Sequence, residues 1–146
     1  MKKKLPFIIA AIAVTIFIFS NSLMDADQST VQSDVVVDMV VEAATSVGIP
    51  IKRFVAEHIV RKSAHILEFA AQGFFVTLCF GSSFKRRLAS VAPIGFITAC
   101  IDESIQLFSN GRAAMVQDIF IDLAGAMAGF LLAMLLVRHI RKGVGK

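Results

Sequence analysis

Four apolar stretches, each about as long as a transmembrane helix, dominate this sequence. They are residues 5–24, 63–84, 88–108 and 118–137. A helix of about 20 apolar residues spans the hydrocarbon core of a lipid bilayer. The sequence therefore predicts an all-α membrane protein with four transmembrane helices, which form a single domain over residues 1–146.

The composition agrees with a membrane location and argues against several classes of soluble protein. Hydrophobic residues make up 56% of the chain and charged residues 18%, whereas about a quarter of the residues in a soluble domain are charged. A nucleic-acid-binding protein needs basic residues on a solvated face, so the net charge of +4 does not lead us to expect nucleic acid as a partner. Two cysteines and no tryptophan or tyrosine argue against a disulfide-rich scaffold, a zinc ribbon and an aromatic platform for stacking bases.

The first apolar stretch, residues 5–24, has two interpretations. Lysines precede it, as they precede the apolar core of a cleaved secretory signal peptide. The sequence Ser20-Asn21-Ser22 is, however, a poor cleavage site. We therefore favour a retained signal anchor that serves as the first transmembrane helix.

The basic residues predict the orientation. Four helices place both termini on the same side of the membrane, and that side carries ten basic residues and no acidic one: Lys2, Lys3, Lys4, Lys85, Arg86, Arg87, Arg138, Arg141, Lys142 and Lys146. The other side, with the polar helix ends, carries five basic residues and all eleven acidic ones. Because basic residues accumulate in cytoplasmic loops, both termini are predicted to be cytoplasmic.

The segment 25–62 is predicted to be external and to form a short amphipathic helix. Asp34, Asp38 and Glu42 recur every four residues among valines and a methionine, which places one acidic stripe on an apolar helix. Gly48-Ile49-Pro50 would end this helix. We expect an interfacial cap over the ends of the transmembrane helices, and the alternative is a mobile lid over a site.

Polar residues gather at the external ends of the last three predicted spans. They are Arg61, His65, Glu68 and Gln72 in the second helix, Asp102, Glu103 and Gln106 in the third, Asp118 and Asp122 in the fourth, and Arg112 in the last loop. Spacings of four, three and four place the first set on one helix face. A charge facing lipid costs several kcal/mol, so these groups should point inward to one polar pocket in the outer leaflet.

The residue types suggest roles within this pocket. We assign proton transfer to four residues: His65, Glu68, Asp102 and Glu103. We assign substrate binding to five others: Arg61, Gln106, Arg112, Asp118 and Asp122. The two arginines could clamp a phosphate or a carboxylate in bidentate fashion. The alternative is a buried ion-pair network that fixes helix register, although carboxylates outnumber cations here.

Two further expectations concern ligands and partners. No compact metal-ligand motif is present, so we expect no metal or other cofactor, although these side chains could bind a divalent cation. Gly125 and Gly129 form a small-xxx-small surface, which permits close packing within the bundle or formation of a homo-oligomer.

The polar residues and their order resemble the VanZ-like family. The matching positions are Arg61-Lys62-x-x-His65-x-x-Glu68, Asp102-Glu103-x-x-Gln106, Gly111-Arg112, Asp118 and Gly125. Phe69, Asn110 and Asp122 stand where the family commonly has Tyr, Pro and Asn. The resemblance implies a multi-pass protein of the bacterial cytoplasmic membrane, and the family's namesake is associated with resistance to the glycopeptide teicoplanin.

Three functions follow from these features. The first is binding or processing of an anionic envelope component, such as a lipid-linked precursor, a phospholipid headgroup or a lipoteichoic-acid intermediate. The second is a non-catalytic scaffold or modulator of envelope properties. The third, a proton path or transporter, is disfavoured because the cytoplasmic halves of the predicted helices lack ionisable residues. Whether the chain is an enzyme stays open.

Overall fold

The computed structural model describes residues 4–80, 83–112 and 114–144. These residues form five α-helices and no β-strand. The helices are α1 (Leu5–Ser22), α2 (Ala26–Ser46), α3 (Arg53–Cys79), α4 (Phe84–Gln106) and α5 (Val116–Val144). The predicted all-α class is confirmed. Lys2, Lys3 and Lys146, which entered the prediction of orientation, lie outside the described residues.

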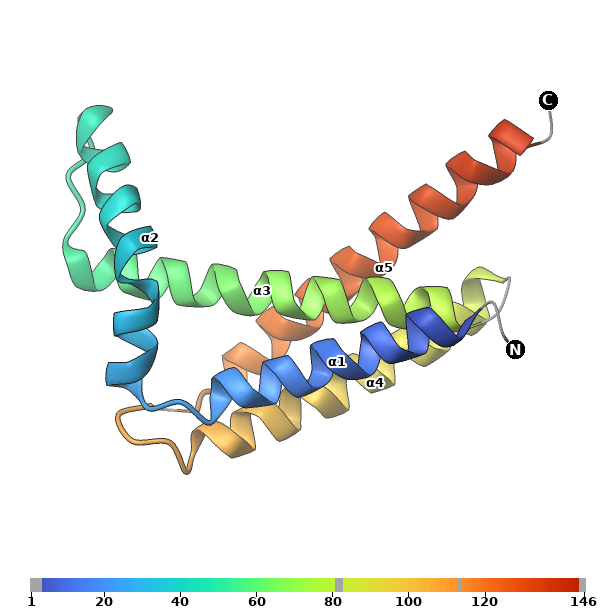
Figure 1. Ribbon diagram of the computed structural model, residues 1–146, viewed down its shortest axis with the longest axis horizontal. Helices are drawn as coiled ribbons and strands as arrows, with labels where there is room; N and C mark the ends of the chain where they lie inside the picture. The colour runs from blue at the N-terminus through green and yellow to red at the C-terminus, as the bar shows by residue number, and fades with distance from the viewer. Residues whose placement is uncertain (1–3, 81–82, 113, 145–146) are drawn as a thin grey trace.

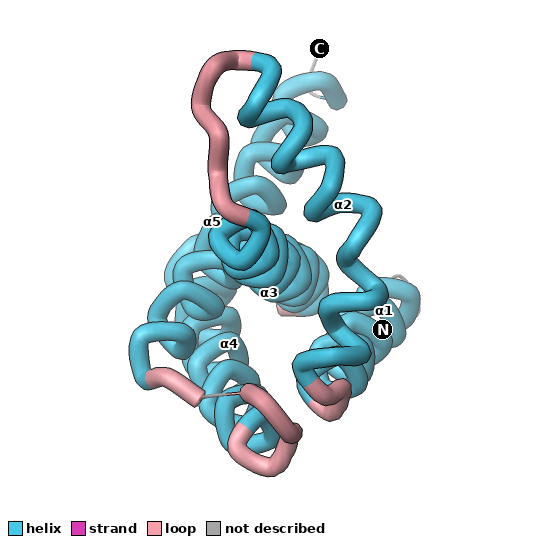
Figure 2. Tube along the Cα trace, turned by 90° about the vertical axis from the view of Figure 1, so that its left-hand side faces the viewer, coloured by secondary structure: helices cyan, strands magenta, loops and turns pink. Residues whose placement is uncertain are grey.

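The helices form an elongated bundle with one helix across its end. In Figure 1, α1, α3 and α4 run side by side along the long axis, and Figure 2 shows the same three grouped in a view along that axis. Helix α5 crosses α3 obliquely, and its second half extends away from the others (Figure 1). Helix α2 lies across the end of the bundle where α1 ends and α3 begins.

Three of the described helices are long and apolar enough to cross a membrane. They are α1, α4 and the part Val116–Lys142 of α5. Helix α3 is long enough, but His65, Glu68 and Gln72 interrupt its apolar sequence. The chain is thus a multi-pass membrane protein by length and composition, and a fourth membrane span stays a prediction.

The helix boundaries differ from the predicted spans. Helix α3 begins at Arg53, ten residues before the predicted start, and ends at Cys79. Residues 53–62, which are predicted to belong to the external segment, are therefore the first part of one long helix. Helix α4 begins at Phe84, where the Ser83 hydroxyl accepts the N–H of Arg86 at 3.3 Å and caps the helix.

Helix α2 confirms the helix predicted from the acidic stripe. Arg53, at the start of α3, forms ion pairs with Asp34 at 2.7 Å and with Asp38. The chain turns between α2 and α3 through Gly48, whose φ of +79° favours glycine. Two of the three stripe acids thus tie α2 to the first turn of α3.

Glycines bring α5 into backbone contact with α3. A Cβ atom on Gly125 would lie 2.7 Å from the carbonyl oxygen of Ile66, and one on Gly129 would overlap the carbonyl oxygen of Ala70. On the α3 side, a Cβ on Gly73 would overlap the carbonyl oxygen of Ala126. The small-residue surface is therefore packed within the chain. Homo-oligomerisation stays a prediction, and it needs a surface that α3 leaves open.

Four helices contribute to a buried apolar layer beneath the polar residues. The layer consists of Ile18, Phe69, Ala99 and Ala126, all of which are fully buried. Each lies three or four residues, or one helical turn, from a polar residue described below. Phe69, where the VanZ-like family commonly has Tyr, packs in this layer without a hydroxyl group to satisfy. The layer forms an apolar floor for the polar cluster.

Replacing Gly129 with leucine should strongly destabilise the protein. The new side chain would overlap the α3 backbone at Ala70, which cannot move away as a side chain could. We expect the free energy of unfolding to fall by about 3 kcal/mol or more. Circular dichroism in detergent measures it, since the chain has no tryptophan. The matched control is Ala128→Leu on the exposed face of α5, which should change stability by about 0.5 kcal/mol at most. Equal effects of the two substitutions would contradict this packing.

Candidate functional site

The predicted site residues meet at the end of the bundle that α2 crosses. Helix α3 supplies the first set, the last turn of α4 the second, and the first turns of α5 the third. The four acidic residues of α4 and α5 are all buried: Asp102, Glu103, Asp118 and Asp122. These four carboxylates therefore point inward, and the predicted pocket residues divide into smaller groups.

The innermost group joins α3, α4 and α5. The Nδ1 atom of His65 lies 3.7 Å from Oδ2 of Asp102 and 3.8 Å from Oδ1 of Asp122. Both distances exceed a normal hydrogen bond. Asp102 and Asp122 are 0% and 1% exposed, so this group is a buried pair of carboxylates with one imidazole between them.

Neighbouring side chains orient Asp102 but not Asp122. The Ser22 hydroxyl donates to Oδ1 of Asp102 at 2.6 Å, and the Gln106 amide donates to Oδ2 at 2.9 Å. The Oδ2 atom of Asp122 is buried and has no hydrogen-bond partner among the described residues. One carboxylate of the group is therefore held in place, while the other keeps an unused acceptor.

Glu68 and Glu103 lie in separate surroundings. The Asn21 amide on α1 donates to Oε1 of Glu68 at 2.7 Å, and the other oxygen of Glu68 has no hydrogen-bond partner among the described residues. Glu103 accepts the backbone N–H of Met115 at 2.9 Å, just before α5 begins. The structure thus places His65 beside two aspartates, Asp102 from the predicted proton-transfer residues and Asp122 from the predicted substrate-binding residues.

Asp118 has a cationic partner. It forms an ion pair with Lys62, and the two side chains are 11% and 21% exposed. The sequence assigned Asp118 to substrate binding, and the structure places it in a contact between the first half of α3 and the start of α5. Gln106 likewise contacts Asp102.

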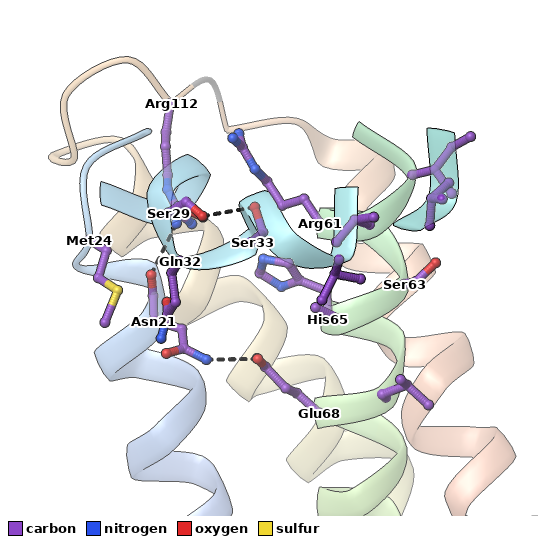
Figure 3. Close-up of a pocket in the computed structure, with 16 residues that line it drawn as sticks. Asn21, Met24, Ser29, Gln32, Ser33, Arg61, Ser63, His65, Glu68 and Arg112 are labelled. Atoms are coloured by element: carbon purple, nitrogen blue, oxygen red, sulfur yellow. Dashed lines mark hydrogen bonds between the residues drawn. The ribbon is translucent and has the colours of Figure 1, made fainter. Parts of the chain in front are cut away.

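Two cavities adjoin these groups. The larger, of about 440 Å³, lies among α1, α2 and α3, and its walls include Val36, Val40 and Leu67. The smaller, of about 240 Å³, lies among α3, α4 and α5 and includes Asp122. Three residues line both cavities: Arg61, His65 and Arg112. Figure 3 shows Arg61 and Arg112 toward one end of the larger cavity, with His65 and Glu68 successively further along α3.

Arg112 is a partly buried cation in the loop between α4 and α5. Its Nη2 atom donates to the backbone oxygen of Asn21 at 3.1 Å, while its buried Nε atom has no partner among the described residues. Burial, and then the nearby charge of Arg61, lowers the pKa of Arg112 below its usual value. Neither arginine forms an ion pair with a described residue. An anion between them would relieve this repulsion.

The sequence reasoning missed the contribution of the first helix. Asn21 and Ser22, which bind Glu68 and Asp102, end the first apolar stretch at the depth of the polar cluster. The sequence could have predicted this contribution, because polar residues at the end of an apolar span need hydrogen-bond partners as much as the polar residues of the other helices do. Ser29 and Ser33 of α2 also line the larger cavity.

The α4–α5 loop is hydrogen-bonded to the α1–α2 junction. Ser109 donates its hydroxyl to the backbone oxygen of Ser22 at 2.7 Å. The N–H of Asn110 donates to Asp25 at 2.8 Å, and the carbonyl of Asn110 accepts from Ala26 at 3.0 Å. The proline common in the family at position 110 has no N–H and could not make the bond to Asp25.

Removing Lys62 should expose the structural role of its pair with Asp118. We expect Lys62→Met to lower the free energy of unfolding by about 2 kcal/mol, below the 3–5 kcal/mol of a fully buried pair because both side chains are partly solvated. The double variant Lys62→Met/Asp118→Asn should lose less than the sum of the two single variants. Circular dichroism unfolding of all four proteins measures this coupling, and strictly additive losses would contradict the pairing.

Comparison with known proteins gives a family but no close relative. No curated protein and no solved structure matches the chain. The sequence matches the VanZ/LLP1 family over residues 7–137. These residues include α3, α4 and every candidate site residue. That span covers most of the chain and confirms the resemblance drawn from the polar motifs. The chain is therefore a membrane protein of the VanZ/LLP1 family.

Proposed function

We propose that this protein binds an anionic, lipid-linked component of the bacterial cell envelope in a pocket at the outer leaflet. The observation that carries this proposal is the position of Arg61 and Arg112, which line an apolar cavity and a polar cavity at once. A ligand with a charged head and a hydrocarbon tail matches such a pair of cavities.

The apolar walls of the larger cavity are the evidence that the ligand has a hydrocarbon part. These walls carry Met24 from the α1–α2 junction, Val36 and Val40 from α2, and Ile59 and Leu67 from α3. Pockets for small ligands are mostly apolar, with a few polar groups that fix orientation. Here Ser29, Ser33 and the two arginines would supply those polar groups.

The charge of the site supports a phosphate or another multiply charged head. Arg61 lies close enough to Arg112 to lower its pKa, and neither guanidinium has an acidic partner within ion-pair distance among the described residues. Arginine presents several N–H donors in a fork that matches phosphate oxygens. The candidates are a lipid-linked precursor, a phospholipid headgroup and a lipoteichoic-acid intermediate.

A membrane placement follows from the charge distribution. Helix α3 would be the fourth span, because it runs beside α1 and α4 along the bundle (Figure 1), and its polar side chains Gln72 and Glu68 find partners inside the bundle. Both termini would be cytoplasmic, and α2 would lie at the external surface. The pocket then opens to the outer leaflet.

His65 and Glu68 give the pocket the means to process its ligand. Both line the larger cavity, and each is a group that can donate or accept a proton. A contribution to teicoplanin resistance would follow if the bound component is a precursor or product of the cell wall. The alternative function is a scaffold or modulator, in which the contacts of Lys62 and His65 with aspartates only fix the helices.

Replacing Arg61 or Arg112 with glutamine should weaken binding of an anionic amphiphile. We expect each substitution to reduce the affinity for undecaprenyl phosphate by at least about 10-fold, because a charged hydrogen bond contributes about 1.5–3 kcal/mol. Native mass spectrometry of the detergent-solubilised protein measures this binding, with phosphatidylglycerol and zwitterionic phosphatidylcholine as comparison lipids.

The matched control is Arg53→Gln. Arg53 is an arginine of α3 whose partners are on α2 and on its own helix, and it lines neither cavity. The Arg53→Gln variant should bind undecaprenyl phosphate as the wild type does. Unchanged affinity in both the Arg61 and Arg112 variants would favour the scaffold function instead. Any protection against teicoplanin should fall in the same two variants.

Thiol labelling in intact cells tests the orientation. In a background without Cys79 and Cys100, Gln28→Cys in α2 should react with a reagent that does not cross membranes. Lys85→Cys at the start of α4 should react only after the cells are permeabilised. Both positions are exposed, so access differs only by the side of the membrane. The reverse pattern would contradict the proposed placement.

A further inference from the structure

We propose that His65, Asp102 and Asp122 form a binding site for a divalent transition-metal ion such as Zn²⁺ or Mn²⁺. The proposal goes beyond the anion-binding function, because it assigns a cation to a group that shares only His65 with the larger cavity. It also revises the expectation from the sequence, in which no compact ligand motif was visible.

The geometry of the three side chains is close to that of a metal site. One ligand atom from each of the three lies within 4.8 Å of the other two. The Nδ1 atom of His65 is 3.7 Å and 3.8 Å from one oxygen of each aspartate. Atoms bound at about 2.1 Å to a tetrahedral ion lie about 3.4 Å from one another. Shifts of a few tenths of an ångström would bring each aspartate oxygen to this distance from Nδ1 of His65.

The charge of the group calls for a cation. Asp102 and Asp122 are 0% and 1% exposed, and no lysine or arginine of the described chain forms an ion pair with either. Lys62, the nearest candidate by sequence, is paired with Asp118. A buried charge without a partner costs several kcal/mol. A dication between the two carboxylates would neutralise them completely while His65 stays neutral.

The unused acceptor of Asp122 points to a ligand independently of the cluster itself. Its Oδ2 atom is buried and makes no hydrogen bond with a described residue, although Asp122 lines the smaller cavity beside His65. Buried polar atoms in native proteins are nearly always satisfied. A coordinated ion, or a water molecule on that ion, would satisfy this oxygen.

The surroundings resemble the outer shell of a metal centre. Ser22 and Gln106 each donate a hydrogen bond to Asp102 and fix the direction of its carboxylate. Such partners orient metal ligands and raise affinity. His65 and Asp122 also line the smaller cavity, so a fourth coordination position would be open to water or to an oxygen of a bound ligand. Arg61 and Arg112 line the same cavity.

The ligand set selects a class of ion. One imidazole nitrogen and two carboxylate oxygens suit Zn²⁺, Mn²⁺ and Fe²⁺. Calcium and magnesium prefer all-oxygen sites, and calcium takes six to eight oxygen ligands. Thiolate chemistry is not involved, because Cys100 is not among the clustered ligands.

Metal retention by the full-length protein tests the proposal. The detergent-solubilised chain is stripped with a chelator, incubated with Zn²⁺, Mn²⁺ or Mg²⁺, passed through a gel-filtration column and measured by mass spectrometry of the elements. We expect about one Zn²⁺ or Mn²⁺ per chain and far less Mg²⁺. The retained ion should also raise the midpoint of thermal unfolding, since it binds only the folded state.

Two variants and one control locate the ion. Asp122→Asn and His65→Gln should each weaken binding by at least about 10-fold, because each removes or weakens one direct ligand. Glu68→Gln is the matched control, since it removes a carboxylate of α3 that is not one of the three proposed metal ligands. This variant should bind the metal ion as the wild type does. Circular dichroism checks that each variant is folded.

Three results would overturn the proposal. They are a wild-type chain that retains neither Zn²⁺ nor Mn²⁺, a preference for Mg²⁺, or wild-type affinity in either ligand variant. The first two come from the unmodified protein, so they decide the matter even if a variant fails to fold. Arg61→Gln and Arg112→Gln should keep the metal while losing the anionic lipid, so the failure of one proposal is distinguishable from that of the other.

Discussion

The close crossing of α3 and α5 is the contact on which the site depends. At Gly125 and Gly129 the backbone of α5 approaches the backbone of α3 more closely than any side chain would allow. Asp122 lies one turn from Gly125, and His65 is next to Ile66, the residue that Gly125 contacts. Because the two backbones meet there, the imidazole and the carboxylate come within 3.8 Å. A wider crossing would leave two buried ionisable groups apart in an apolar environment.

The polar groups around this crossing are satisfied to different degrees. Asp118 is paired with Lys62, and Glu103 accepts a backbone N–H at the start of α5. These contacts hold the last loop and α5 in place. Arg61 and Arg112, by contrast, form no ion pair with a described residue. Arg112 and Asp122 each have a buried polar atom with no hydrogen-bond partner among the described residues. These three residues all line the smaller cavity. A ligand would therefore find them already arranged, which lowers the entropy lost on binding.

The sequence predicted the elements and the depth of the site better than its internal contacts. The four-residue spacing of Asp34 and Asp38 predicted α2, and the spacing of Arg61, His65 and Glu68 predicted a single polar face. Periodicity describes one helix at a time, however. The partner of His65 depends on how α3, α4 and α5 cross, and this is decided by small residues that carry no polar signal. The early start of α3 was missed because its first turns are amphipathic, so they read as a separate surface segment.

The hydrogen bond from Ser22 to Asp102 has a consequence for how the protein is made. The two residues are 80 positions apart, so at about 5–20 residues per second the ribosome adds Asp102 roughly 4–16 s after Ser22. This hydrogen bond can form only after α4 has been made, when the last turn of α4 docks against the end of α1. Cleavage after the first apolar stretch would remove Asn21 and Ser22, which donate to Glu68 and to Oδ1 of Asp102. Helix α1, which is long and apolar enough to cross a membrane, thus also supplies two side chains to the polar cluster.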